Sequence, residues 1–342
     1  MIYTCTLNPS LDYYLEFEQP IVKGATNRSS YDGFRAGGKG INVSIMLNNL
    51  QIPSRALGFL GGFTKDYYIQ LMQKYPKIQP SFTYVEGNTR INIKLQDGQN
   101  TDLNVKGPAV TDANFSNLSM KASRLDDRDF FVFAGNLIAG TKEKVIEMLK
   151  ETIANEVKVV LDTDTDVIKA VAPCSPFLVK LTQTELAKYA GREILDREQT
   201  ILEAKAMHRE GVRHVMIILD DRSQAIMVCD KGVYVSNIIR EEVPLSTVGA
   251  GDSMTAGFIT EYIVTRDPEE SFRFAVCGNF HIFDGIFRKG HFNCQIAVPS
   301  GNSCLIGASL ISQACARHEG CAQSRGCKYS HYFCFCHKNA PF

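Results

Sequence analysis

The sequence predicts a mostly parallel α/β sheet with helices on both faces and a small β lid. From about residue 130 onward, short apolar strands rich in β-branched residues alternate with helical segments, which is typical of repeated βα units. Upstream, two runs of alternating apolar and polar residues flank Asp97-Gly98 and predict a hairpin. The chain has 342 residues, enough for one large α/β domain with an excursion or for two modest domains.

The N-terminal part combines buried strands with this hairpin. A helix is expected to open at Gly37-Gly38-Lys39-Gly40, because the apolar residues that follow recur at helical spacing. The hairpin has one polar and one apolar face, so it predicts a small sheet that projects from the main body and pairs with the strand over 13–17. The strands expected here cover residues 2–7, 13–17, 56–60, 91–95 and 103–105.

The following part, up to residue 219, keeps a regular strand–helix rhythm without an internal repeat or a low-complexity linker. Its expected strands cover residues 130–133, 157–161, 177–180 and 215–219, and its expected helices cover residues 142–155, 167–171 and 198–210. Such an order of elements predicts a parallel sheet that is covered on both faces.

Composition excludes some classes of function. The 37 basic and 37 acidic residues balance, which argues against a global electrostatic grip on nucleic acid or on an acidic membrane. The N-terminus has no basic segment followed by an apolar one, so no signal peptide is expected. The longest charge-free stretch, 294–316, carries too many polar residues for a membrane span. A cytoplasmic protein is expected.

The strongest motif is Thr247-Val248-Gly249-Ala250-Gly251-Asp252-Ser253, which leads into an apolar helical stretch. Glycines let a backbone approach a ligand closely. The free N–H groups at the start of the helix bind an anion, most often a phosphate. A carboxylate beside that phosphate can orient a hydroxyl for attack. The alternative is a glycine-rich turn in which Asp252 is only the N-cap.

Two further motifs point to a polar ligand. Gly37-Gly38-Lys39-Gly40-Ile41-Asn42 again places glycines before a helix, with a lysine and an amide that can hold phosphate and hydroxyl groups. It is not a nucleotide P-loop, because Gly40 stands where Ser or Thr is required and no apolar strand leads into it. Asp12 follows the first strand, on the side where α/β sheets bind ligands, although a turn-capping role is the common alternative.

The order of these motifs resembles the phosphofructokinase B branch of the ribokinase-like carbohydrate kinases. The motifs are Asn8-Pro9-Ser10-Leu11-Asp12, then 36–43, then Gly87-Asn88-Thr89-Arg90-Ile91-Asn92, then 247–253. The resemblance covers about residues 1–279, and the N-terminus together with the Thr-Arg-Ile-Asn run is most similar to the bacterial 1-phosphofructokinase group. It implies an ATP-dependent, cytoplasmic kinase that phosphorylates fructose 1-phosphate on its C6 hydroxyl, with the tagatose-6-phosphate kinases as near relatives.

The resemblance also implies roles for individual residues. Asp252 would be the base that orients and deprotonates the sugar hydroxyl. The amides that form the anion hole would come from Gly249, Ala250 and Gly251. The residues that hold the sugar would be Asp12, Gly38, Lys39 and Asn42, and those that hold its phosphate would be Arg90, Lys39 and Arg28. The nucleotide would be bound by Lys180, Thr182, Glu185, Thr247, Gly249, Gly251 and Asn279.

Cofactor and partners follow from the same resemblance. ATP would carry Mg²⁺ on its phosphates, with Glu185 as a metal ligand, and Mg²⁺ needs only one or two carboxylates plus water. The lid would consist of strands over about 12–18 and 89–106, and it would pair two subunits in a homodimer. The partners are otherwise small molecules, with no nucleic acid and no membrane.

Several departures cluster on the nucleotide side. The family's Asn-x-x-Glu reads Thr182-Gln183-Thr184-Glu185 here, and a loop that usually contains glycine reads Asp220-Asp221. An intact sugar side beside this altered nucleotide side keeps a second function open, a catalytically impaired protein that binds sugar phosphates. A dinucleotide-dependent oxidoreductase is the weakest alternative, because Gly249-x-Gly251 lacks a third glycine at the required spacing.

The domain division follows the resemblance. Residues 1–279 form the expected kinase domain, and residues 280–342 form a Cys/His-rich tail that is not family sequence. Seven of the eleven cysteines lie in this tail, which has only two acidic residues and no sustained period. A zinc module and a shifted reading frame are the two interpretations. The lack of periodicity and of paired Cys-x-x-Cys spacing favours the shifted frame.

Overall fold

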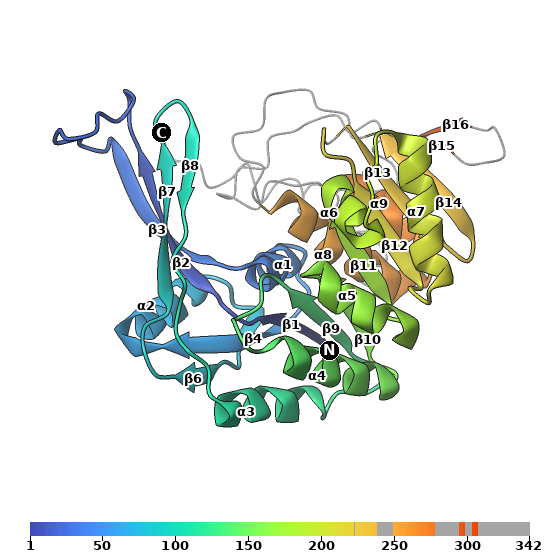
Figure 1. Cartoon of the computed structure of the whole chain (residues 1–342), viewed down its shortest axis with the longest axis horizontal. Helices are drawn as coiled ribbons and strands as arrows, with labels where there is room; N and C mark the ends of the chain where they lie inside the picture. Colours follow the sequence, from blue (N-terminus) through green and yellow to red (C-terminus); the bar gives the residue numbers. More distant parts are fainter. Residues whose placement is uncertain (222, 238–248, 278–293, 298–302, 307–342) are drawn as a thin grey trace, which may run out of the picture. The chain divides into compact units, whose positions relative to one another are not determined.

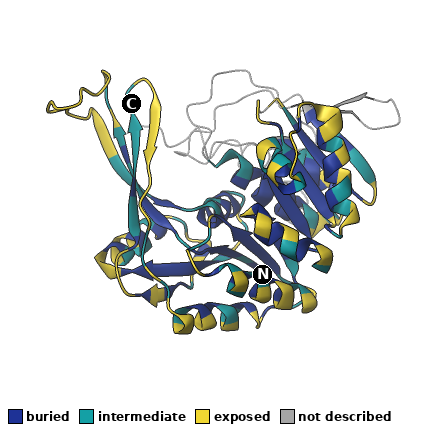
Figure 2. Cartoon of the chain, in the orientation of Figure 1, coloured by how far each residue is buried: buried dark blue, intermediate teal, exposed yellow. Residues whose placement is uncertain are grey.

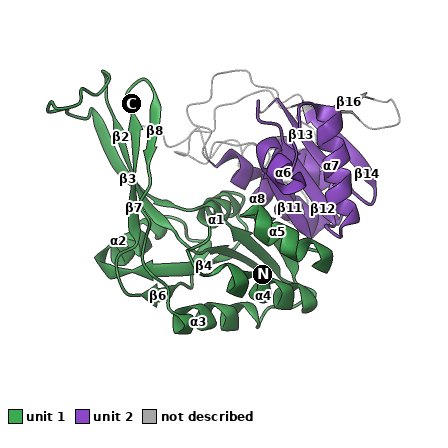
Figure 3. Cartoon of the chain, in the orientation of Figure 1, with its two compact units in different colours: residues 1–176 green, residues 177–342 purple. Residues whose placement is uncertain are grey.

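The computed structural model of the chain describes residues 1–221, 223–237, 249–277, 294–297 and 303–306. These residues divide into two compact units, 1–176 and 177–342 (Figure 3). The expected division at residue 279, between the kinase domain and the tail, stays a prediction. Of the predicted tail, only two short strands are described, so both interpretations of its Cys/His-rich sequence concern residues outside the described ones.

Unit 1 is built on a parallel sheet in the order β10-β9-β1-β4-β5, with β6 parallel to β4. Its elements are β1 (Ile2–Thr6), β2 (Ser10–Glu16), β3 (Tyr31–Gly37), α1 (Lys39–Asn49), β4 (Ser54–Gly61), α2 (Gly62–Met72), β5 (Ile78–Pro80), β6 (Thr83–Val85), β7 (Arg90–Gln96), β8 (Asn100–Leu103), α3 (Asp112–Ala122), β9 (Phe130–Ala134), α4 (Lys142–Ala154), β10 (Lys158–Asp162), α5 (Thr165–Val171) and the 3-10 turn η1 (Ala172–Cys174). Helix α1 lies on one face of the sheet, and α3 and α4 lie on the other (Figure 1).

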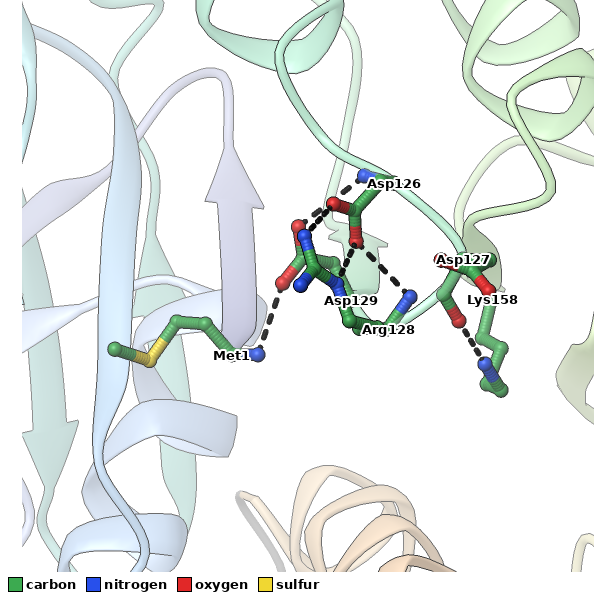
Figure 4. Close-up of polar contacts among 6 residues, drawn as sticks. All are labelled: Met1, Asp126, Asp127, Arg128, Asp129 and Lys158. Carbon is green, nitrogen blue, oxygen red and sulfur yellow. Dashed lines mark hydrogen bonds and ion pairs between the residues drawn. The ribbon is translucent and has the colours of Figure 1, made fainter.

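Burial explains why the central strands form. Every residue of β9 is buried, and β1 and β4 are buried almost throughout, as expected for parallel strands with helices on both faces (Figure 2). Immediately before β1, the ammonium group of Met1 donates to Asp129 Oδ1 at 2.9 Å. Arg128 pairs with Asp126 in the same turn before β9 (Figure 4). The ion pair between the N-terminus and Asp129 therefore joins the start of β1 to the turn before β9.

A second, four-stranded sheet in the order β3-β2-β7-β8 is the predicted lid. Strand β2 pairs antiparallel with β3 and parallel with β7, and β7 and β8 form the expected hairpin at Asp97-Gly98. The sequence did not predict β3, which leads directly into α1. It carries Asp32, Gly33 and Arg35 in place of an apolar run, and it forms because β2 pairs with it along seven residues.

Unit 2 has the sheet order β16-β15-β14-β13-β12-β11, in which only β11 and β12 are parallel. Its elements are β11 (Leu178–Thr182), α6 (Gln183–Ala190), α7 (Arg197–Arg209), β12 (His214–Ile218), β13 (Gln224–Cys229), β14 (Gly232–Asn237), α8 (Ala250–Thr265), α9 (Pro268–Cys277), β15 (Cys294–Ala297) and β16 (Ser303–Ile306). The antiparallel strands after β12 were not predicted.

An aromatic cluster forms part of the core of unit 2. The rings of Phe177, Phe258 and Tyr262 surround His214, with centroids 4.7 to 5.7 Å from the imidazole. The His214 Nδ1 atom lies 2.7 Å from the carbonyl oxygen of Phe177. Burial lowers the pKa of His214 to about 4, so the ring is neutral at physiological pH. The cluster packs the helix that carries Asp252 against the strands.

Candidate active site

In unit 1, the carboxylate of Asp12 on β2 is fixed by two donors. Ser10 Oγ donates to Oδ1 at 2.7 Å, and Asn92 Nδ2 on β7 donates to the same oxygen at 3.1 Å. The carboxylate lies against the backbone of Gly37 on β3, where a methyl group would come within 2.3 Å of Oδ2. Glycine at position 37 is therefore required for this approach. Asp12 does not simply cap a turn, because it lies within a strand and faces the neighbouring one.

Burial and the neighbouring polar groups shift the pKa of Asp12 in opposite directions. Burial raises the pKa of Asp12, while hydrogen bonds from Ser10 and Asn92 and the positive charges of Lys94 and Arg90 lower it. Burial lowers the pKa of Arg90, and the charge of Asp12 raises it. The structure thus brings Asp12 and Arg90, both predicted substrate residues, close enough for their charges to interact.

Arg90 is half-buried and incompletely bonded. Its Nη1 donates to the carbonyl oxygen of Val105 at 3.3 Å. Its Nε is buried and has no hydrogen-bond partner among the residues that the structure describes. A buried guanidinium nitrogen without a partner is costly. The group is therefore suited to bind an anion such as the phosphate of a sugar.

The start of α1 holds the other predicted sugar residues. Gly38 is the N-cap, and the N–H of Asn42 donates to its carbonyl oxygen at 2.9 Å. The N–H of Gly40 donates to Thr6 Oγ1 at 2.9 Å, which ties the helix to the end of β1. Lys39 Nζ donates to Asp162 Oδ1 at 2.8 Å, and Asp162 is only 2% exposed. Sequence reasoning missed Asp162, because it is far away in the chain and no motif marks it.

Arg28 lies apart from the other predicted phosphate ligands within unit 1. It is exposed in the segment between β2 and β3, beyond the end where Glu16 pairs with Tyr31. Asp12 pairs with Arg35, four residues nearer the other end. At roughly 3.3 Å per residue, this register separates the backbone at Asp12 from the Arg28 end of the strands by about 13 Å. The role of Arg28 stays a prediction.

In unit 2, α8 begins as the glycine motif predicts. Gly249 is the N-cap in a left-handed conformation with φ of 84°, and Ser253 donates to its carbonyl oxygen through both N–H and Oγ. Asp252 is the third residue of the helix and is 5% exposed. It is therefore not the N-cap. Its carboxylate lies in the same turn as the N–H groups of Ala250 and Gly251, where helix geometry leaves them without a partner in the helix.

Lys180 on β11 lies over this first turn. A methyl group built on Gly251 would lie 2.8 Å from Lys180 Nζ, and Lys180 is only 5% exposed. The structure thus places a buried ammonium beside the predicted anion hole. Backbone amides, a positive helix end and a lysine together favour a phosphate group.

Some of the remaining residues predicted to bind the nucleotide have structural roles in the fold. Thr182 and Glu185 form a capping box at the start of α6, in which the N–H of Thr182 donates to Glu185 Oε2 at 2.8 Å. Asp220 accepts from the N–H and the hydroxyl group of Thr184, at 3.2 and 2.6 Å. The carboxylate of Asp220 is therefore hydrogen-bonded to the first turn of α6. Thr247 and Asn279 lie outside the described residues.

Neither a metal-binding cluster nor a membrane-spanning helix occurs among the residues that the structure describes. Within residues 1–221, 223–237, 249–277, 294–297 and 303–306, no group of three or more His, Cys, Asp or Glu side chains could hold a metal ion. Over the same ranges, no helix has the length and apolar character needed to cross a membrane.

Comparison with known proteins identifies the family. The family model for pfkB family carbohydrate kinases matches residues 6–282. A 1-phosphofructokinase of Bacillus subtilis is 36% identical over 280 residues, which cover 81% of this chain and 90% of the relative. A D-tagatose-1-phosphate kinase of Bacillus licheniformis is 29% identical over 80% of this chain and 90% of its own length. The chain belongs to the pfkB family of carbohydrate kinases.

A solved structure supports the fold. Phosphofructokinase-2 from Escherichia coli, crystallised with substrates and products, matches 81% of this chain and 91% of its own length with a TM-score of 0.76 and 24% identity. The predicted fold class, a mostly parallel α/β sheet with a β lid, is confirmed. The prediction of a carbohydrate kinase that uses ATP is likewise confirmed at the level of the family.

Proposed function

We propose that this protein transfers the terminal phosphoryl group of ATP to the C6 hydroxyl of fructose 1-phosphate and so forms fructose 1,6-bisphosphate. The names of its relatives support the choice of sugar. The observation that carries the chemistry is the start of α8, where Asp252 shares one helical turn with Gly249, Ala250 and Gly251. Phosphoryl transfer needs positioning and charge neutralisation more than it needs a strong base.

The proposed roles divide between the two units. In unit 2, the amides of the first turn of α8 and the ammonium of Lys180 would stabilise the charge that develops on the transferred group. Asp252 would orient the sugar hydroxyl and accept its proton late in the transfer. In unit 1, Asp12 would accept hydrogen bonds from the sugar, together with Gly38, Lys39 and Asn42. Arg90 would bind the sugar's phosphate.

We further propose that Mg²⁺ accompanies ATP and that Glu185 contacts it. One oxygen of Glu185 accepts the N–H of Thr182, and a carboxylate has lone pairs for about four partners. The remaining lone pairs of Glu185, at the start of α6, can therefore contact Mg²⁺ through a water molecule. Bound Mg²⁺ would neutralise the charge of the nucleotide phosphates. Glu185 would keep its place through the capping box.

A homodimer through the lid and a cytoplasmic location complete the proposal. The lid exposes Tyr31 and Leu103, which the strand register places on opposite faces of the sheet. Leu103 lies on the edge strand β8, and an exposed edge strand is a suitable contact for a second copy. Sedimentation of a Leu103→Lys variant tests the dimer: a persisting dimer would count against a lid contact. The thiols of Cys5 and Cys229 are free and buried, which fits a reducing compartment.

The test of the activity is a coupled ADP-release assay. It compares fructose 1-phosphate, tagatose 6-phosphate and fructose 6-phosphate as acceptors, with Asp252→Asn as the matched control. General-base loss predicts a fall in kcat of about 10² to 10⁴. Turnover of fructose 1-phosphate no greater than that of the control would refute the proposal. Calorimetric binding of sugar phosphate without binding of Mg·ATP would then favour a sugar-phosphate binder instead.

A further inference from the structure

The segment that leaves the lid, residues 104–107, is held by side chains rather than by a strand. The N–H of Val105 donates to Asn92 Oδ1 at 3.1 Å, and the carbonyl oxygen of Val105 accepts from Arg90 at 3.3 Å. One residue further, Asn8 Nδ2 donates to the carbonyl oxygen of Lys106 at 3.1 Å. We call residues 104–107 the return segment. Two of the side chains that hold it are next to Asp12.

The chemistry of its two partners fixes the orientation of the Asn92 amide. A backbone N–H only donates, so the atom that faces Val105 must be the oxygen. The amide nitrogen then faces Asp12, whose ionised carboxylate only accepts. A flipped amide would place donor against donor and acceptor against acceptor. Asn92 is 4% exposed, so water cannot readily replace either bond.

We propose that Asn92 is a positioning residue for Asp12, and that the return segment holds its amide in the orientation that keeps the carboxylate aimed and ionised. The proposal rests on the proposed function, in which Asp12 accepts hydrogen bonds from the sugar. Asn92 itself acts through Asp12 and through Val105, not through the substrate.

The hydrogen bond from Asn92 is important because Asp12 is largely buried. Burial raises the pKa of Asp12, and the Asn92 donor is one of the four influences that lower it again, with Ser10, Lys94 and Arg90. Tyr68 also faces this group: its hydroxyl donates to the carbonyl oxygen of Gly37, and burial, followed by the charge of Asp12, raises the pKa of Tyr68. A protonated Asp12 would lose acceptor capacity toward a sugar hydroxyl.

Glycine at position 107 lets the return segment come close enough. Gly107 has φ of 80°, and a methyl group there would lie 2.3 Å from Asn8 Oδ1. Asn8 follows β1, so its amide links the return segment to the main sheet of unit 1. The N–H of Val105 therefore has a fixed place from which to hold Asn92.

Asn92→Asp separates positioning from mere structure. The variant keeps an acceptor for the N–H of Val105 but turns an acceptor with negative charge toward Asp12. We expect the KM for fructose 1-phosphate to rise about 30-fold at pH 8, the factor for one lost hydrogen bond to a charged group, with the KM for ATP within about twofold. The rise should shrink at pH 6, because two neighbouring carboxylates then share a proton.

Asn100→Asp is the matched control, since Asn100 is exposed on β8 of the same sheet and gains the same charge. Equal kinetics of the two variants at both pH values would overturn the proposal.

If the wild-type protein phosphorylates no sugar phosphate, the proposed function fails, but the positioning can still be measured. Carbon NMR of the Asp12 carboxyl group, assigned with Asp12→Asn, should show a titration midpoint about one unit higher in Asn92→Leu. An unchanged midpoint would overturn the proposal.

Discussion

Gly37→Ala offers a sharp test of the sugar-side geometry. The added methyl group would lie 2.3 Å from Asp12 Oδ2, 2.6 Å from Cγ and 2.9 Å from Oδ1, so the whole carboxylate must move. Its bonds from Ser10 and Asn92 both end on Oδ1, and each hydrogen bond to a charged group contributes about 1.5–3 kcal/mol. Alanine gains about 0.4–1 kcal/mol through the unfolded chain. Loss of one bond therefore leaves about 1.5 kcal/mol of destabilisation.

The assay is urea unfolding in two backgrounds, wild type and Asp12→Ala. Without a carboxylate the methyl group at position 37 meets nothing charged, so only the gain of about 0.4–1 kcal/mol from alanine should remain. The coupling between the two substitutions should therefore be about 2 kcal/mol. In kinetics, the KM for fructose 1-phosphate should rise about 30-fold, while the KM for ATP stays unchanged. Equal destabilisation in both backgrounds would refute the reasoning.

Two further outcomes are expected in unit 2. The unfolded state binds a proton at His214 below its ordinary pKa of 6.5, while burial keeps the native pKa at about 4, so stability is full above pH 6.5 and falls as the pH drops toward 4. The fall should amount to about 3 kcal/mol, and His214→Phe should remove this part of the pH dependence of urea unfolding; an unchanged slope would contradict it. In Gly251→Ala, the new methyl group, 2.8 Å from Lys180 Nζ, should displace the ammonium. The KM for ATP should rise about tenfold with the melting temperature held, because alanine favours the helix; a rise confined to the KM for the sugar would contradict the assignment of Lys180.

The sequence was informative where one local pattern decides the structure. The glycines before Asp252 and the apolar period after it predicted α8, and the turn at Asp97-Gly98 predicted the hairpin. Strand β3 could not be predicted in this way, because it forms only through pairing with β2. Helix α6 could have been predicted, since Thr182-Gln183-Thr184-Glu185 has the pattern of a capping box.

The sequence could propose individual site residues but could not supply the contacts between them. Motif order predicted Asp12 and Arg90, which the structure brings together. The partners that fix them, Asn92 and the backbone of Val105, depend on the register of the lid sheet, which no local pattern specifies. Glu185 presents a different difficulty: its position in the sequence fits a capping box, which the structure shows, and also the metal ligand that we propose.

The pair of Lys39 and Asp162 has a consequence for selectivity among anions. An anion that attracts Lys39 must compete with the carboxylate of Asp162, which is almost fully shielded from water. Weakening that pair leaves a buried charge without its counter-ion, which is costly. A weakly charged ligand gains little from such an exchange. If an anion binds Lys39 as proposed, its charge must therefore offset the weakening of this buried ion pair.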